Sequence, residues 1–195
     1  YAIVDTLDEL EALVADMRAA GTVSIAVESS SEDALRGQLV GVAISVEGGS
    51  ARYLPFWHAQ PFELTFEGED SSEVRNLPGL ETPGLAGLKA VLEDPAVGKS
   101  GHDLKHVALA LSTAGVTLAG HEIDVMVASY VLDPGRRGHE LKTLSMEVFS
   151  HKPLQRGDVT GSGRSKVSFA DVPVERASAY LCGAVDLAGQ LAGHL

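Results

Sequence analysis

The chain has 195 residues, of which 45% are hydrophobic and 22% charged, and its formal net charge is −12. This composition is typical of one globular domain and contains no run long enough to span a membrane. Because phosphate neutralisation supplies much of the affinity for nucleic acids, an acidic chain is a poor candidate for a stand-alone DNA-binding module. The single cysteine, Cys182, excludes an internal disulfide and favours a cytoplasmic location.

The first part of the chain predicts a helix followed by a strand hairpin. Thr6 and Glu9 have capping-box spacing before an apolar stripe of helical period, which Gly21 ends. Strands are predicted over residues 23–27, 39–46 and 51–57, with a turn at residues 48–49. The polar stretch 61–83, interrupted by Gly and Pro, is expected to be an exposed loop.

The remainder alternates helices with short strands. Helices are predicted over residues 85–92, 102–114, 123–132, 140–149 and 174–195. Strands are predicted over residues 96–99 and 116–118, and a loop over 150–168. The order of elements indicates a single α/β domain, residues 1–195, with a mixed β-sheet flanked by helices. The start at Tyr1, without an initiator Met, suggests a fragment of a longer protein.

Five segments resemble the 3′–5′ exonuclease domain of bacterial DNA polymerase I. In chain order they are SIAVESSSEDALRGQLVGVAISVEGGSARYLPFWH, VGKSGHDLKHVALAL, AGVTLAGHEIDVMVASYVLDP, HELKTLSMEVFSHKP and GSGRSKVSFADVPVERASAYLCGAVDLAGQL. The resemblance runs through nearly the whole chain from Val23 onward and implies a ribonuclease H-like fold. It also implies a polymerase domain C-terminal to Leu195 in the same chain, DNA contact through that parent protein, and a monomer.

Active members of this family use four carboxylates on three chain segments to hold two Mg²⁺ or Mn²⁺ ions, which cleave a phosphodiester bond. The resemblance places the corresponding vestigial site, including the tyrosine that orients water, at Ala26, Glu28, Val107, Tyr180 and Ala184. Three of the four carboxylates are thus replaced, and Glu28 alone offers too few oxygen ligands for two hard cations. We therefore expect no bound cofactor and an inactive exonuclease domain that serves as a structural platform for the polymerase.

Two alternatives remain open. An active exonuclease could have rebuilt a metal site from Glu28, Asp103 and Asp124, although Asp103 also stands where a helix cap is expected. Alternatively, the chain could be a free-standing nucleic-acid interaction module of the ribonuclease D type. The sequence encoded after Leu195 would separate this alternative from the platform interpretation.

One stretch reverses the acidic character of the chain. Residues 150–168 carry four cations, Lys152, Arg156, Arg164 and Lys166, against the single acid Asp158. Such a local excess of positive charge predicts contact with a DNA backbone, and a solvated loop is the alternative.

Overall fold

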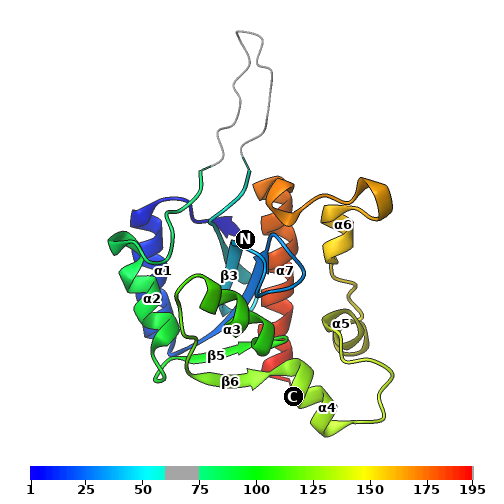
Figure 1. Cartoon of the computed structure of the whole chain (residues 1–195). Helices are drawn as coiled ribbons and strands as arrows, with labels where there is room; N and C mark the ends of the chain where they lie inside the picture. The colour runs from blue at the N-terminus through cyan, green and yellow to red at the C-terminus, as the bar shows by residue number, and fades with distance from the viewer. Residues whose placement is uncertain (60–74, 195) are drawn as a thin grey trace.

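The computed structural model describes residues 1–59 and 75–194, which form a mixed β-sheet with helices on both faces (Figure 1). The strand order is β1-β4-β3-β2-β5-β6. Strands β2, β3 and β4 pair antiparallel, whereas β1, β5 and β6 each join a neighbour in parallel. The strands are β1 (Ala2–Ile3), β2 (Thr22–Ser29), β3 (Leu39–Glu47), β4 (Ser50–Pro55), β5 (Gly98–Gly101) and β6 (His121–Asp124). The predicted α/β class with a mixed sheet is confirmed.

Apart from α6, which lies within the predicted loop 150–168, the helices follow the predicted order. They are α1 (Leu7–Ala20), α2 (Ala86–Glu93), α3 (Leu104–Thr113), α4 (Val125–Leu132), α5 (Leu141–Phe149), α6 (Arg156–Thr160) and α7 (Val174–Ala192). The side chain of Thr6 accepts a hydrogen bond from the amide of Glu9, and Gly21 ends α1 with a φ of 72°, as the capping pattern predicts. Among the described residues, no helix is long and apolar enough to cross a membrane.

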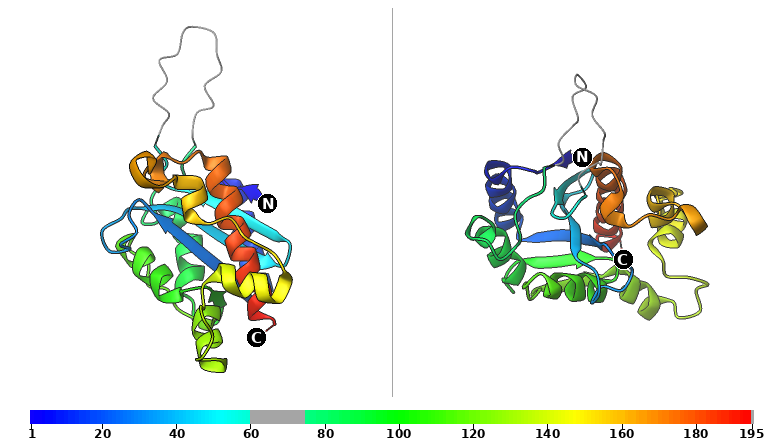
Figure 2. Two further views of the ribbon diagram at one scale, coloured as in Figure 1. Left: turned by 90° about the vertical axis from the view of Figure 1, so that its right-hand side faces the viewer. Right: turned by 45° about the horizontal axis from the view of Figure 1, so that its top comes forward.

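Alternation along β2 directs its side chains to opposite faces of the sheet. Ile25 and Val27 join a core cluster formed with α1, α2 and α3. Ala26 packs against a second cluster, built largely by α7 and the segment before it. The two faces are visible in Figure 2, where α1 and α7 lie on opposite sides of the strands. The face covered by α7 is therefore the one toward which Ala26 and Glu28 point.

A buried polar contact fastens β4 to the segment that precedes α7. The ring of His58 lies with Nε2 2.6 Å from the Tyr53 hydroxyl and Nδ1 2.9 Å from the Val172 carbonyl oxygen. Gly41 on β3, which pairs with Pro55, leaves room for the side chain of Tyr53, since a Cβ at Gly41 would collide with the tyrosine hydroxyl. Burial lowers the pKa of His58, which favours the neutral ring.

The strand predicted over residues 116–118 is wrong. Val116 and Leu118 are buried in the core, but the amides of Val116 and Ala119 donate to carbonyls of Leu111 and Leu92 at helix ends. The edge strand is β6, which pairs with β5 although its sequence, HEID, has little β-branched character. Residues 116–118 therefore form a connecting segment whose apolar side chains pack into the core, and pairing with the sheet starts at His121.

Other boundaries also shift. Strand β5 lies at residues 98–101 instead of 96–99, α3 begins after Asp103, and α4 begins after Asp124. The predicted loop 150–168 contains helix α6 and a 3₁₀ turn at Gly163–Ser165. Residues 61–74 of the predicted loop 61–83 lie outside the described residues. The last residue of that loop, Pro83, is the first residue of a 3₁₀ turn, Pro83–Leu85.

Candidate functional site

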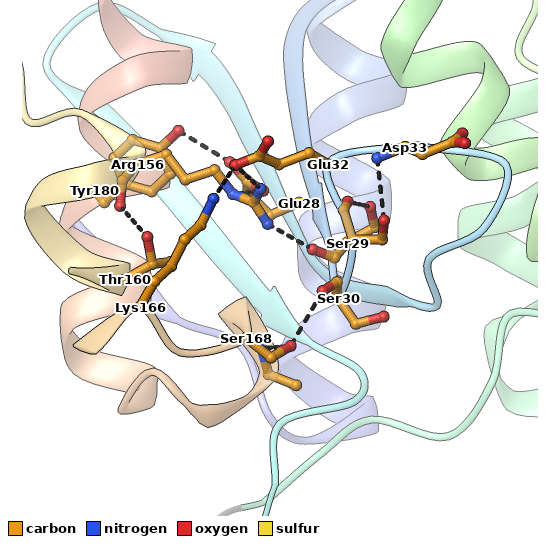
Figure 3. Close-up of polar contacts among 12 residues, drawn as sticks. Glu28, Ser29, Ser30, Glu32, Asp33, Arg156, Thr160, Lys166, Ser168 and Tyr180 are labelled. Carbon is orange, nitrogen blue, oxygen red and sulfur yellow. Dashed lines mark hydrogen bonds and ion pairs between the residues drawn. The ribbon is translucent and has the colours of Figure 1, made fainter. Parts of the chain in front are cut away.

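Glu28 stands near the end of β2 and is almost fully buried, with 8% of its surface exposed. Its Oε1 accepts a hydrogen bond of 2.9 Å from the hydroxyl of Tyr180 on α7. Its Oε2 lies 3.0 Å from Nε of Arg156, an ion pair that lacks the angular geometry of a hydrogen bond. Figure 3 shows Glu28 enclosed between these two side chains. Both carboxylate oxygens therefore already have partners from this chain.

Arg156, the first residue of α6, joins two further groups near the end of β2. One terminal nitrogen donates to the carbonyl oxygen of Ser29 at 3.0 Å, and the other lies 3.5 Å from Glu32 Oε1. The guanidinium also lies over the ring of Phe169, 5.8 Å from its centroid. Because this side chain is only 20% exposed, the arginine acts as an internal cation beside Glu28.

Charge and burial oppose each other at this site. Burial raises the pKa of Glu28, while the positive charge of Arg156 and the hydrogen bond from Tyr180 lower it in part. The pKa of Tyr180 is raised well above its ordinary value by burial and by the neighbouring carboxylate. At the exposed rim, Lys166 and Arg156 lower the pKa of Glu32. Arg156 and Tyr180 therefore both favour the ionised form of Glu28, against the effect of its burial.

Of the five positions implied by the resemblance, four lie on the face of the sheet that α7 covers, and Val107 lies in the cluster on the other face. Ala26 and Glu28 share the face of β2 that α7 covers, and Tyr180 contacts Glu28 directly. Ala184, half-buried, follows Tyr180 by one helical turn and shares its side of α7. Val107 is buried in the other cluster, with the residues of α1 and α2. A valine there serves packing, since only 2% of it is exposed.

Asp103 and Asp124, the residues of the rebuilt-site alternative, act as helix caps. The carboxylate of Asp103 accepts from the amide of His106 at 3.2 Å. That of Asp124 accepts from the amides of Asp103 and Leu104 at 3.1 and 2.7 Å, and from Met126 at the start of α4. Within the described ranges, no group of three or more His, Cys, Asp or Glu is placed to hold a metal ion. The donor set around Glu28 does not fit a pair of divalent cations.

Of the four cations predicted to contact DNA, two form ion pairs with acidic residues of this chain and two lie on the surface. The guanidinium of Arg156 already has partners within the chain, namely Glu28, Ser29 and Glu32, so its contact with DNA stays a prediction. Lys166 is paired with Glu32, although it remains exposed. Lys152 and Arg164 lie on the surface, where a phosphate backbone could reach them. Sequence reasoning missed the Arg156–Glu28 pair because 128 positions separate the partners and no local pattern marks it.

Comparisons with known proteins agree with this architecture. A family model described as DNA polymerase I, ribonuclease H-like domain, matches residues 82–172. DNA polymerase I of Rhizobium leguminosarum is 31% identical over 197 residues, an alignment that covers 96% of this chain and 19% of the relative. The chain thus spans about a fifth of the length of the curated relatives it matches.

Solved structures show the same fold. The POL domain of Pol1 from M. smegmatis, in complex with DNA primer-template and dNTP, has a TM-score of 0.65 and 22% identity, covering 100% of this chain and 27% of that one. Trypanosoma brucei RNase D has a TM-score of 0.68 and 17% identity, covering 100% of this chain and 64% of that one. Together with the relatives above, these findings confirm the resemblance to the 3′–5′ exonuclease domain of DNA polymerase I and the ribonuclease H-like fold that it implies.

Proposed function

We propose that this domain no longer hydrolyses DNA and serves as a structural platform within a longer DNA polymerase I chain. The family's reaction depends on two divalent ions held by several carboxylates, which activate a water and neutralise the leaving oxygen. In this chain Ala26, Val107 and Ala184 stand at three of those positions. The two residues that remain, Glu28 and Tyr180, bind one another, and no ligand set for such ions is found within the residues that the structure describes.

The observation that carries the proposal is the enclosure of Glu28 by Arg156 and Tyr180. A metal ion at Glu28 would have to displace a guanidinium 3.0 Å from Oε2 and would then face its positive charge. A hard cation such as Mg²⁺ also requires several oxygen ligands and gives up its water reluctantly. The fixed charge of Arg156 therefore provides the neutralisation that metal ions would otherwise supply, without their ability to activate water.

The platform role follows from what the domain retains. Across the described residues the sheet packs against an apolar cluster on each face, so the framework is present without the three carboxylates. The chain covers 19% of the relatives' length, which supports a place inside a larger protein. DNA synthesis, in this proposal, belongs to the polymerase part of that protein. Lys152 and Arg164 contribute at most a weak, salt-sensitive contact with its DNA.

A nuclease assay on the purified chain tests the proposal. A 5′-labelled single-stranded oligonucleotide should stay at full length in millimolar Mg²⁺ or Mn²⁺, with and without EDTA. The matched control is Glu28→Ala, which distinguishes this domain from a contaminating nuclease. Stepwise shortening that EDTA stops and Glu28→Ala abolishes would overturn the proposal and favour a rebuilt metal site.

A further inference from the structure

Helix α4 exposes apolar side chains along most of its length. Its eight residues, VMVASYVL, include no charged side chain. Val125 and Ser129 are buried, whereas Val127, Tyr130, Val131 and Leu132 are each more than half exposed. A helix that is apolar all round is ordinarily buried on all sides, whereas a surface helix carries a polar face. We call these four exposed residues the α4 patch.

We propose that the α4 patch is the docking surface for the polymerase part of the same polypeptide. This inference rests on the proposed function, because that function supplies the longer chain. Apolar patches bordered by polar residues mark interaction sites. Asp133, which follows Leu132 at the end of α4, forms an ion pair with Arg136, and Arg136 also pairs with Glu147 of α5. The cation nearest to the end of α4 in sequence is therefore held between two carboxylates of this chain.

The position of α4 within the fold favours a partner joined to this chain. Its buried residue Val125 packs in one cluster with Leu144 of α5 and with Ala188 and Leu191 near the end of α7. The ring of His194 lies beside Phe149 of α5, 6.3 Å between centroids. In Figure 1 the end of α7 lies next to α4. A segment continuing from α7 would leave the fold within reach of the patch.

The size of the patch also favours a tethered partner over a second copy of this chain. An eight-residue helix is about 12 Å long, so its exposed side covers much less than the roughly 800 Å² per partner of a stable interface between separate proteins. A covalent link raises the effective concentration of a partner to the millimolar range, so that a small contact suffices. Nucleic acid is a poor occupant, because the patch itself offers no cation.

Cysteine labelling tests the proposal in the full-length polymerase chain. Leu132→Cys places a thiol in the patch, and Leu35→Cys is a matched control, because the two leucines are 63% and 62% exposed. The native Cys182 is buried, and burial raises the pKa of its thiol to about 11, so it does not compete at pH 7. Maleimide labelling of each variant is compared between residues 1–195 alone and the full-length chain, at sub-micromolar protein.

We expect Leu132→Cys to label at least tenfold more slowly in the full-length chain, while Leu35→Cys changes less than twofold. Equal labelling of Leu132→Cys in the two proteins would overturn the proposal. Protection that needs added primer-template, or that appears in residues 1–195 alone as concentration rises, would also overturn it in favour of DNA or a second copy. Primer extension by the full-length chain, together with the nuclease assay, tests the proposed function separately, so docking can fail while that function stands.

Discussion

Replacing Arg156 by methionine tests the idea that this arginine neutralises the buried Glu28. The substitution removes the guanidinium that lies 3.0 Å from Glu28 Oε2, and keeps an unbranched side chain over Phe169. Glu28 would then keep the Tyr180 hydroxyl as its hydrogen-bond donor, with its negative charge still buried. An unpaired charge in this position is costly, so the folded state should lose stability.

Protonation of Glu28 limits how large that loss can be. A glutamate with an ordinary pKa of about 4.3 can take up a proton at pH 7 for roughly 3.7 kcal/mol, since each pKa unit corresponds to about 1.36 kcal/mol. Arg156 is 20% exposed, so some water will reach the vacated position and reduce the effect. We therefore expect Arg156→Met to lower the free energy of unfolding by about 2–3.5 kcal/mol at pH 7.

The stability loss caused by Arg156→Met should become smaller as the pH is lowered. Burial already raises the pKa of Glu28 above its unfolded value, and loss of Arg156 raises it further. The folded variant then binds more protons than its unfolded chain between the unfolded pKa and the raised one, so its stability falls as pH rises through that window. At pH 5 the proton costs only about 1 kcal/mol, and the difference from the parent protein should shrink accordingly.

Urea unfolding followed by circular dichroism at pH 7 and pH 5 measures these differences. The double-mutant cycle uses Glu28→Gln, which keeps an oxygen for Tyr180 to bind but carries no charge. In the Glu28→Gln background, Arg156→Met should cost about 1 kcal/mol, from the lost bond to Ser29 and from packing. Additive effects, or a loss that does not change between the two pH values, would refute the internal-cation interpretation.

Three other changes have defined outcomes. Because burial lowers the pKa of His58, the unfolded chain binds more protons below about pH 6.5, so stability should drop between pH 7 and 5, and His58→Gln should flatten that slope in urea titrations. Restoring acids at Ala26, Val107 and Ala184 together should lower the metal-free melting temperature, at about 1–3 kcal/mol per site, and millimolar Mn²⁺ should recover part of it. If Mn²⁺ does not raise the melting temperature of this triple variant, the correspondence with the family's metal site is contradicted. Asp124→Ala should cost about 2–3 kcal/mol in thermal unfolding, since its carboxylate caps two helices, and a loss below 0.5 kcal/mol would contradict that role.

The fold could be predicted largely from local patterns. The apolar stripe before Gly21 and the β-branched runs of β2, β3 and β4 each carry the period of the element they form. Strand β6 could not be found this way, because an edge strand of sequence HEID is held by its pairing with β5. Pairing between segments distant in sequence leaves little trace in the composition of either one.

The candidate site was even harder to predict from local patterns, because its residues come from distant parts of the chain. The resemblance pointed to Glu28 and Tyr180, which the structure brings within 2.9 Å of each other. Local charge alone led to the prediction that Arg156 contacts DNA, whereas the structure places its guanidinium against Glu28 and Ser29 at the end of β2. A cation in a basic stretch has the same local sequence whether it faces solvent or a buried acid, so only the tertiary structure separates the two.

The placement of α7 has a consequence for biosynthesis. This last helix covers the face of β2, β3 and β4 that would otherwise expose Ala26, Ala43 and their neighbours to water. A ribosome adds roughly 5–20 residues per second, so on the order of ten seconds pass between completion of β4 and completion of α7. During that interval the face of these strands that α7 covers lacks its apolar cover. The nascent domain is therefore most exposed to aggregation and to chaperone capture just before residues 174–192 emerge from the ribosome.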